Sequence, residues 1–331
     1  MNKYIFFRTD RIGDFLMSSI LFKSIKRSDS NSRIIIVASK KNYSYIKNAD
    51  FIDEVILYPE SFLDKFIFYF NFFLKKFYLV GILDGKKRSI YFSFLVRSKF
   101  KFLFTFKSFY KLLFNFFFTK IFLDKNSSNK ISEIQSLLKI INLTYETNDL
   151  NTINKEIVLK RNFDFSNLNN FILIHFDEKW ISNDYIKTYV PIEPINEAIF
   201  FDFLKKIILK SNSNLVVSTG LKDNNYIHYL KNKLTLISKN IYSEDKQDKK
   251  IFLYDNLSFL ELEKLILLSS KIITCHGAPS HVAAAFNKKI IDIIDKSEDE
   301  FFFKWTAHFR NHHLVFREKF NYLTKNILNL L

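Results

Sequence analysis

Residues 271–286, with the sequence KIITCHGAPSHVAAAF, constrain the fold of this chain more than any other stretch. The apolar run at 272–275 predicts a buried strand, and Gly277 marks a turn after it. Pro279 is tolerated at the first position of a helix, and residues 282–286 continue that helix. A second apolar run at 290–294 predicts another strand. Strand, tight turn, helix and strand form the repeating unit of a parallel α/β sheet.

The turn in this stretch directs backbone N–H groups and a helix N-terminus toward the space beyond the strand, which suits a phosphate group. His276 and His281 flank that N-terminus. A phosphate site and a merely structural turn with solvated histidines both remain open on these residues alone. We expect no metal here, because no nearby carboxylate completes a site and Cys275 should point to the other side of its strand.

The same alternation of strands and helices continues along the chain. Apolar runs predict strands at 4–7, 33–38, 54–57, 171–175, 215–218 and 251–254. Amphipathic helices are predicted between them, which makes the class α/β with parallel sheets. At 331 residues the chain is longer than one core usually grows, so we expect two domains. The polar stretch at 142–154 is the best candidate for a linker between them. We therefore expect one Rossmann-like domain at 1–150 and a second at 151–331.

The composition of the chain favours some binding partners and excludes some kinds of binding site. The net charge of +16 favours anionic partners: a nucleotide, a phospholipid surface or a nucleic acid. One cysteine, Cys275, excludes a disulfide framework and a multi-cysteine zinc site. Five glycines form neither a GxGxxG nor a GxxxxGK[ST] motif. The N-terminus has only four apolar residues in a row, so we expect no signal peptide and an intracellular protein.

The segment 61–125 differs from the rest of the chain. It holds 19 of the 40 Phe residues, and 13 Lys and Arg against 3 acidic residues. Its longest uncharged run, 66–74, is nine residues, far short of the roughly 20 that span a bilayer. Aromatic clusters among lysines favour a segment that lies on an anionic membrane surface. A buried α/β core with solvated lysines is the alternative. Nucleic-acid binding is not expected, because no known reader motif accompanies the charge.

Four segments, the last of them in two parts (257–262 and 276–285), match in order the motifs of one protein family. Residues 7–16, FRTDRIGDFL, are similar to R-x-x-x-I-G-D-x-L, and residues 80–89, VGILDGKKRS, to D-L-x-G-x-x-R-S. Residues 175–180, HFDEKW, are more weakly similar to a segment in which a Lys-x-Trp or Lys-Trp pair is common. Residues 257–262 and 276–285 are similar to L-S-L-x-E-L and D-T-G-P-x-H-L-A-A-A. Together they resemble the ADP-heptose:lipopolysaccharide heptosyltransferase family, glycosyltransferase family nine, which has the GT-B fold.

This resemblance implies two Rossmann-like domains facing each other across a cleft, with 1–150 binding the acceptor and 151–331 the donor. It implies an inverting, metal-independent transfer of a sugar such as heptose from a nucleotide sugar such as ADP-heptose. The acceptor would be a lipid-linked glycan such as lipopolysaccharide core, and no other cofactor is expected. The place would be the cytoplasmic face of the bacterial inner membrane, with peripheral attachment. A GT-B nucleotide-sugar epimerase and a non-catalytic sugar-binding relative are the alternatives.

The resemblance also assigns roles to residues. Asp14 would be the general base, with a helix N-cap as the alternative. Arg8, Arg11 and Arg88 would bind anionic groups of the acceptor, with surface salt bridges as the alternative. The donor would be bound by Lys179, Thr219, Gly220, His276, Gly277, Ala278, Pro279, Ser280 and His281. His276 stands where the family has Asp. A neutral histidine both donates and accepts where carboxylate only accepts, so we expect donor selection to differ.

Overall fold

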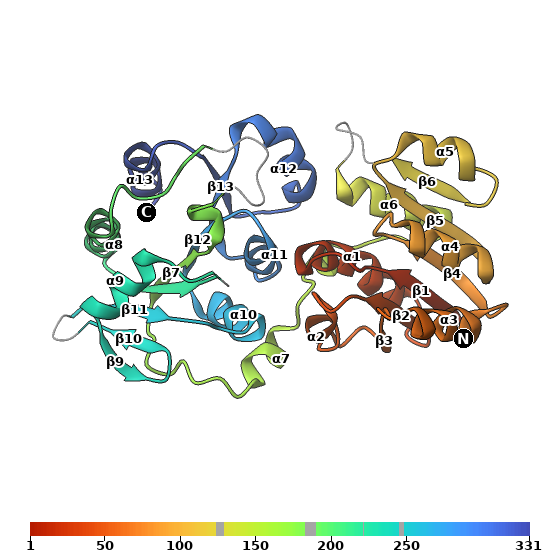
Figure 1. The fold of residues 1–331 in the computed structure, drawn as a ribbon, viewed down its shortest axis with the longest axis horizontal. Helices are drawn as coiled ribbons and strands as arrows, with labels where there is room; N and C mark the ends of the chain where they lie inside the picture. The colour runs from red at the N-terminus through yellow and green to blue at the C-terminus, as the bar shows by residue number, and fades with distance from the viewer. Residues whose placement is uncertain (124–128, 183–189, 221, 245–247) are drawn as a thin grey trace. The chain divides into compact units, whose positions relative to one another are not determined.

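The computed structural model describes residues 1–123, 129–182, 190–220, 222–244 and 248–331. It contains two compact units, each with its own sheet (Figure 1). Unit 1 comprises Met1–Thr152 and Phe303–His308, and unit 2 comprises Ile153–Phe302 and Phe309–Leu331. The sequence did not predict that six residues from the C-terminal half would pack with unit 1.

Unit 1 is built on a six-stranded parallel sheet in the order β3-β2-β1-β4-β5-β6. Its strands are β1 (Lys3–Phe7), β2 (Arg33–Ala38), β3 (Glu54–Leu57), β4 (Lys76–Ile82), β5 (Arg97–Thr105) and β6 (Lys120–Leu123). Its helices are α1 (Ile12–Ser28), α2 (Tyr43–Ile46), α3 (Phe62–Phe72), α4 (Lys87–Leu95), α5 (Ser108–Phe114), α6 (Lys130–Ile140) and the 3₁₀ turn η1 (Thr147–Leu150). The strand order reverses between β1 and β4. Ligands of open α/β sheets bind at the carboxyl ends of strands at such a reversal.

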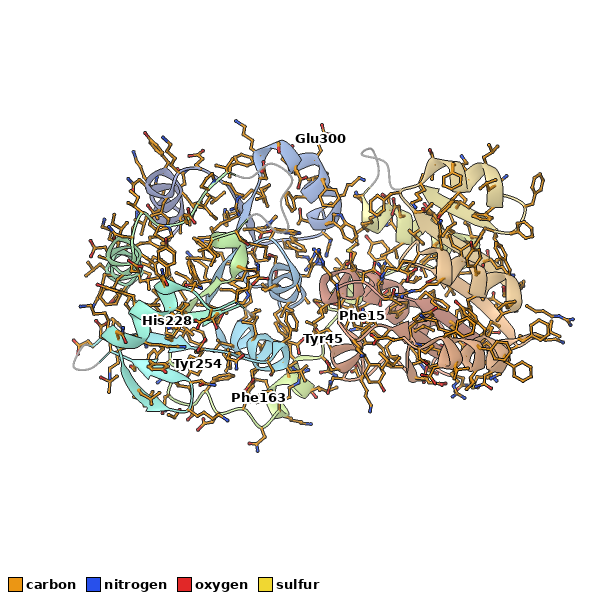
Figure 2. The ribbon with its side chains drawn as sticks, viewed as in Figure 1. Phe15, Tyr45, Phe163, His228, Tyr254 and Glu300 are labelled. Atoms are coloured by element: carbon orange, nitrogen blue, oxygen red, sulfur yellow. The ribbon has the colours of Figure 1, made fainter. Side chains whose placement is uncertain are left out.

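The core of unit 1 is strongly aromatic. Phe15 of α1 packs against Tyr45 of α2, with ring centroids 6.1 Å apart (Figure 2). The predicted strands at 4–7, 33–38 and 54–57 are confirmed. The segment 61–125 supplies β4, β5 and β6, so part of it is a regular α/β core, as the alternative interpretation expected. The outer sides of α3 and α5 nevertheless leave many large apolar side chains exposed.

Unit 2 has an eight-stranded sheet in the order β14-β13-β12-β7-β8-β11-β10-β9. Its strands are β7 (Phe171–Phe176), β8 (Asn214–Thr219), β9 (Thr235–Ser238), β10 (Ile241–Ser243), β11 (Ile251–Tyr254), β12 (Lys271–Cys275), β13 (Lys289–Ile294) and β14 (His312–Phe316). Its helices and 3₁₀ turns are α7 (Lys155–Lys160), η2 (Glu178–Trp180), α8 (Glu197–Ser211), α9 (Asn225–Lys233), α10 (Phe259–Leu268), α11 (Ala278–Ala285), η3 (Lys296–Glu298) and α13 (Phe320–Asn329). The helix α12 (Asp299–Thr306) begins in unit 2, and its residues from Phe303 on belong to unit 1. Six of the strands are parallel, while β10 and β9 extend the sheet antiparallel.

The strand, turn, helix and strand predicted at 271–294 are confirmed as β12, α11 and β13. The helix begins at Ala278, so Pro279 is its second residue, one position later than predicted. Both positions suit proline, because the first turn of a helix leaves its N–H groups without intrahelical partners. Across the described residues, we find no helix whose length and hydrophobicity would let it cross a bilayer.

Candidate active site

Arg8 follows β1 directly and is buried, with 7% of its surface exposed. Its guanidinium donates to the carboxylate of Asp10 at 2.8 Å and to the hydroxyl of Ser18 at 2.7 Å. The interpretation of Arg8 as a surface salt bridge is therefore wrong, because its partners are reached inside the unit. Burial raises the pKa of Asp10, Arg8 opposes that rise, and the neighbouring Asp14 adds to it.

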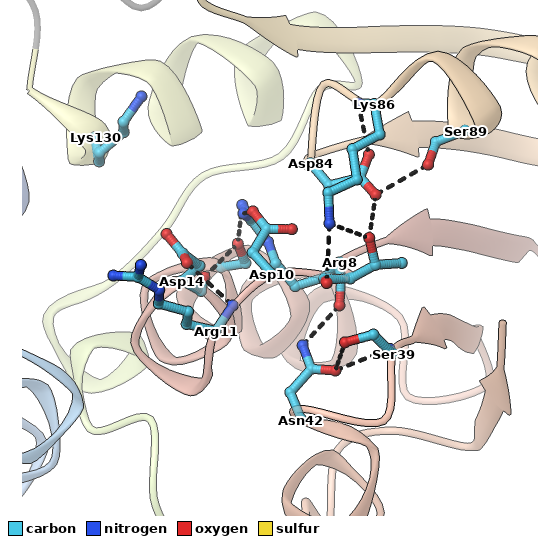
Figure 3. A network of polar contacts seen from close by, with 12 residues as sticks. Arg8, Asp10, Arg11, Asp14, Ser39, Asn42, Asp84, Lys86, Ser89 and Lys130 are labelled. Atoms are coloured by element: carbon cyan, nitrogen blue, oxygen red, sulfur yellow. Dashed lines mark hydrogen bonds and ion pairs between the residues drawn. The ribbon is translucent and has the colours of Figure 1, made fainter. Parts of the chain in front are cut away.

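A second polar network joins the loop after β1 to the loop after β4 (Figure 3). Thr9 donates its hydroxyl proton to Asp84 at 2.6 Å. The same hydroxyl accepts from the Lys86 ammonium at 2.9 Å and from Arg88 at 3.0 Å. The Arg88 guanidinium also lies 4.3 Å from the centroid of the Tyr58 ring. The two loops at the strand reversal are thus cross-linked by charged groups.

Asp14 lies in the first turn of α1, near the pairs made by Arg8 (Figure 3). The N-cap of this helix is Arg11, which is exposed, so the interpretation of Asp14 as the N-cap residue is wrong by three positions. The Asp14 carboxylate instead accepts the backbone N–H of Arg11 at 3.2 Å. One long hydrogen bond leaves this carboxylate largely available for another donor.

A pocket of about 90 Å³ in unit 1 brings these side chains together. Its polar lining includes Arg8, Asp10, Asp14 and Asp84. Lys130, which pairs with Glu133 at 2.9 Å, lines another part of it. Sequence reasoning missed Asp10, Asp84 and Lys130, although Asp10 stands within the motif that identified Asp14. Arg11 and Arg88 are not among the residues that line this pocket.

In unit 2, Lys179 connects the ends of two neighbouring strands. Its ammonium donates to the carbonyls of Cys275 and His276, at 3.2 and 2.9 Å, and pairs with Asp177 at 2.9 Å. Burial alone would lower the pKa of Lys179, but the Asp177 carboxylate reverses this and raises it. A Cβ atom on Gly277 would lie 2.6 Å from that ammonium, so a side chain at 277 would displace it. Lys179 therefore shapes the turn before α11.

Behind that turn lies the carboxylate of Asp292 in β13, which is fully buried. It accepts from the hydroxyl of Ser280 at 2.8 Å and faces His276 Nδ1 at 2.7 Å and His312 Nε2 at 3.0 Å. The expectation that no carboxylate lies near His276 is wrong. Parallel pairing sets Asp292 of β13 opposite Thr274, which lies one residue before the end of β12. Within the described ranges, no group of acidic, histidine or cysteine residues could hold a metal ion.

On the other side of β7, Thr219 is the last residue of β8 and Gly220 follows it. The Thr219 hydroxyl donates to Asp255 at 2.8 Å, and Asp255 pairs with Lys231 at 2.7 Å. A Cβ atom on Gly220 would lie 2.5 Å from the Glu178 carboxylate, so glycine permits this close approach. The predicted donor residues thus belong to three strand ends, of β7, β8 and β12, at the same edge of the sheet.

No protein-family model and no curated protein sequence matches this chain. Solved structures do match. A glycosyltransferase of family 9 from Veillonella parvula has a TM-score of 0.65 at 16% identity, covering 95% of this chain and 86% of its own. An E. coli heptosyltransferase, WaaC, with ADP-2-deoxy-2-fluoro heptose has a TM-score of 0.66 at 10% identity, covering 99% and 100%. The chain has a GT-B fold.

The GT-B fold confirms the predicted α/β class with two Rossmann-like sheets. A UDP-GlcNAc 2-epimerase from Methanocaldococcus jannaschii is also similar, with a TM-score of 0.55 at 13% identity, covering 99% of this chain and 92% of its own. Because a fold serves many chemistries, the activity has to be argued from the site residues.

Proposed function

We propose that this chain is an inverting glycosyltransferase that needs no metal ion. It moves a sugar such as heptose from a nucleotide diphosphate sugar to a lipid-linked glycan such as lipopolysaccharide core. The observation that carries the proposal is Asp14: a lightly bonded carboxylate in a pocket at the strand reversal of a GT-B fold. The comparison structure that holds an ADP-heptose analogue supports an ADP-sugar as the donor.

In this proposal Asp14 accepts the proton of the acceptor hydroxyl, while the oxygen of that hydroxyl attacks the anomeric carbon of the donor sugar. The bond from that carbon to the diphosphate breaks, and the nucleoside diphosphate leaves with the electron pair. Attack from the opposite face inverts the anomeric centre. Arg11 and Arg88 would bind anionic groups of the acceptor, while Arg8 holds Asp10 in place.

We expect the donor at the strand ends of unit 2, where Thr219, Gly220 and the turn residues 276–281 gather. His281 and the N-terminus of α11 would stabilise the departing diphosphate. Lys179 and Ser280 are already bonded to protein groups, so we expect them to hold the turn in shape. Gly277, Ala278 and Pro279 would bring backbone close to the ligand.

A membrane-bound acceptor suits the outer side of unit 1. Ring contacts join α3 to α4 through Phe68 and Phe92, at 5.6 Å, and α4 to α5 through Phe94 and Phe114, also at 5.6 Å. The three helices therefore form one layer. We name its exposed apolar side chains the aromatic face: Phe62, Leu63, Phe66, Ile67, Phe70, Tyr91, Phe94, Phe109, Leu112, Leu113, Phe116 and Phe117. We propose that it attaches the protein to an anionic membrane surface, on the cytoplasmic face of the bacterial inner membrane.

A thermal-shift screen over ADP-, UDP- and GDP-sugars tests the donor site. Ligand at 100 times its dissociation constant should add roughly 2.7 kcal/mol of stability. We expect stabilisation by an ADP-sugar, and turnover only when a lipid-linked glycan is added. Stabilisation by none of these sugars would contradict the proposal. Interconversion of a free nucleotide sugar without acceptor would favour the epimerase.

A further inference from the structure

The Asp292 carboxylate is the centre of a closed polar cluster in unit 2. It is 0% exposed and contacts the hydroxyl of Ser280 in α11, the imidazole of His276 in the turn after β12, and the imidazole of His312 in β14. Aromatic rings hold the two imidazoles in place. His276 packs against Phe302 with centroids 4.8 Å apart, and Phe309 packs against His312 at 5.0 Å. Neither imidazole can turn without disturbing its neighbours.

The charge of Asp292 fixes where the histidine protons are. Burial alone would raise the pKa of this carboxyl, but His276 and His312 hold it well below its usual range. An ionised carboxylate only accepts hydrogen bonds. The nitrogens that face it must therefore both carry hydrogen, which places a proton on Nδ1 of His276 and on Nε2 of His312.

The other nitrogen of His276 is then determined as well. In the neutral ring with hydrogen on Nδ1, Nε2 bears a lone pair and only accepts. No residue that the structure describes forms a hydrogen bond with Nε2, and the side chain keeps 11% of its surface exposed. The described residues thus leave one acceptor nitrogen of this ring unpaired, at the turn where we expect the donor.

We infer that Asp292 makes His276 a hydrogen-bond acceptor for one hydroxyl group of the donor sugar. The identity of this ligand rests on the proposed function, whereas the position of the ring proton does not. The family that the sequence resembles has a carboxylate at this place, which also only accepts. The histidine therefore keeps the direction of that hydrogen bond while removing the negative charge. We expected from the sequence that His276 would change donor selection because a neutral histidine both donates and accepts. The fixed proton leaves only the accepting nitrogen for the donor.

Two-bond ¹⁵N–¹H correlation spectra of the full chain, labelled with ¹⁵N-histidine, test the proton position. At a pH where the rings are neutral, we expect hydrogen on Nδ1 of His276. The His276→Gln variant assigns the signal. His228 is a matched control, because its exposed ring pairs with Asp223 through Nε2, at 3.0 Å. Hydrogen on Nε2 of His276 would overturn the inference.

The Asp292→Asn variant tests the consequence for binding. The amide of Asn can donate to Nδ1, so the proton should move to Nε2 and the outward group should become a donor. The experiment compares affinities for ADP-heptose and its deoxyfluoro analogues by calorimetry. In each analogue fluorine replaces one hydroxyl group, and fluorine cannot donate a hydrogen bond. Wild-type protein should bind one analogue about three- to tenfold more weakly than the hydroxylated sugar, and the variant should lose this preference.

If Asp292→Asn does not fold, His312→Gln provides a second test. It removes the other imidazole and should leave the His276 proton on Nδ1 and the preference intact. Equal preference in wild-type protein and Asp292→Asn would overturn the inference while leaving the glycosyltransferase proposal standing. Wild-type protein that binds no nucleotide sugar would defeat that proposal, and the spectra would still decide the proton position.

Discussion

At the scale of single residues, the two carboxylates after β1 differ in what holds them. Asp10 is paired with the buried Arg8, whereas Asp14 accepts one backbone N–H at 3.2 Å. Asp14 can therefore take a hydroxyl proton without breaking an ion pair. We predict that Asp14→Asn keeps donor affinity but lowers kcat roughly 10²- to 10⁴-fold, the usual share of a general base.

Glu261→Gln is the matched control for that variant. Glu261 occupies the same third helical position in α10 and accepts the N-cap N–H of Ser258 at 2.7 Å. Both substitutions weaken a helix start by a similar amount, but only Asp14→Asn should reduce sugar transfer. Normal turnover by Asp14→Asn would leave Asp14 with a capping role alone.

The buried Asp292 carries a prediction about stability. Because the pKa of Asp292 is depressed in the folded protein, its carboxylate stabilises the fold when the pH is above the ordinary carboxyl pKa of about 4. This stabilisation is lost as the pH falls below that value. Asp292→Asn should lower the free energy of unfolding by about 3 to 5 kcal/mol at pH 7. In urea titrations the gap between variant and wild type should shrink below pH 4. Exposed Glu300→Gln should change the free energy by less than about 0.5 kcal/mol.

At the scale of elements, the aromatic face exposes large apolar side chains that a binding partner would bury. Phe116 is 95% exposed and Phe70 72%, and burying such a side chain contributes about 1.5 to 3 kcal/mol. We predict that changing Phe66, Phe70, Phe116 and Phe117 to Ser reduces flotation with anionic vesicles at least about tenfold. Leu209→Ser, on the 82% exposed Leu209 of α8, should not. Equal flotation with neutral and anionic vesicles, or none, would count against attachment through this face.

The sequence predicted strands well where apolar residues stand next to one another, even in short runs. The strands β3 and β11 begin and end at the predicted residues. It missed β9, whose four residues are all exposed and so show no alternation, and β14, which begins with two histidines. Neither pattern is typical of a strand. Both strands depend on pairing with a neighbouring strand, and the sequence does not identify that neighbour.

The candidate site was predictable only in part, for a related reason. The motif residues from Arg8 to Asp14 are consecutive, so their gathering at the end of β1 follows from the strand alone. Asp292 lies sixteen residues after His276, and only the parallel register of β12 and β13 brings them together. One signal was present: a lone Asp within the apolar run of β13 has to find partners when it is buried.

At the scale of the whole molecule, two Rossmann-like units divide the proposed work. Unit 1 offers the carboxylate pocket and the aromatic face, and unit 2 offers the strand ends that suit a nucleotide sugar. An epimerase would need no lipid-linked acceptor and no apolar surface. The aromatic face therefore favours transfer to a membrane-bound acceptor over epimerisation.

The most direct measurement is an incubation of the purified chain with ADP-heptose and a lipid-linked glycan lacking its terminal sugar. Mass spectrometry follows the glycan, and NMR gives the anomeric configuration of the new linkage. We predict that one sugar is added with inversion, that ADP is released in equal amount, and that neither occurs without the glycan. Donor that binds but is never transferred, or that is converted to an epimer without acceptor, would contradict a glycosyltransferase.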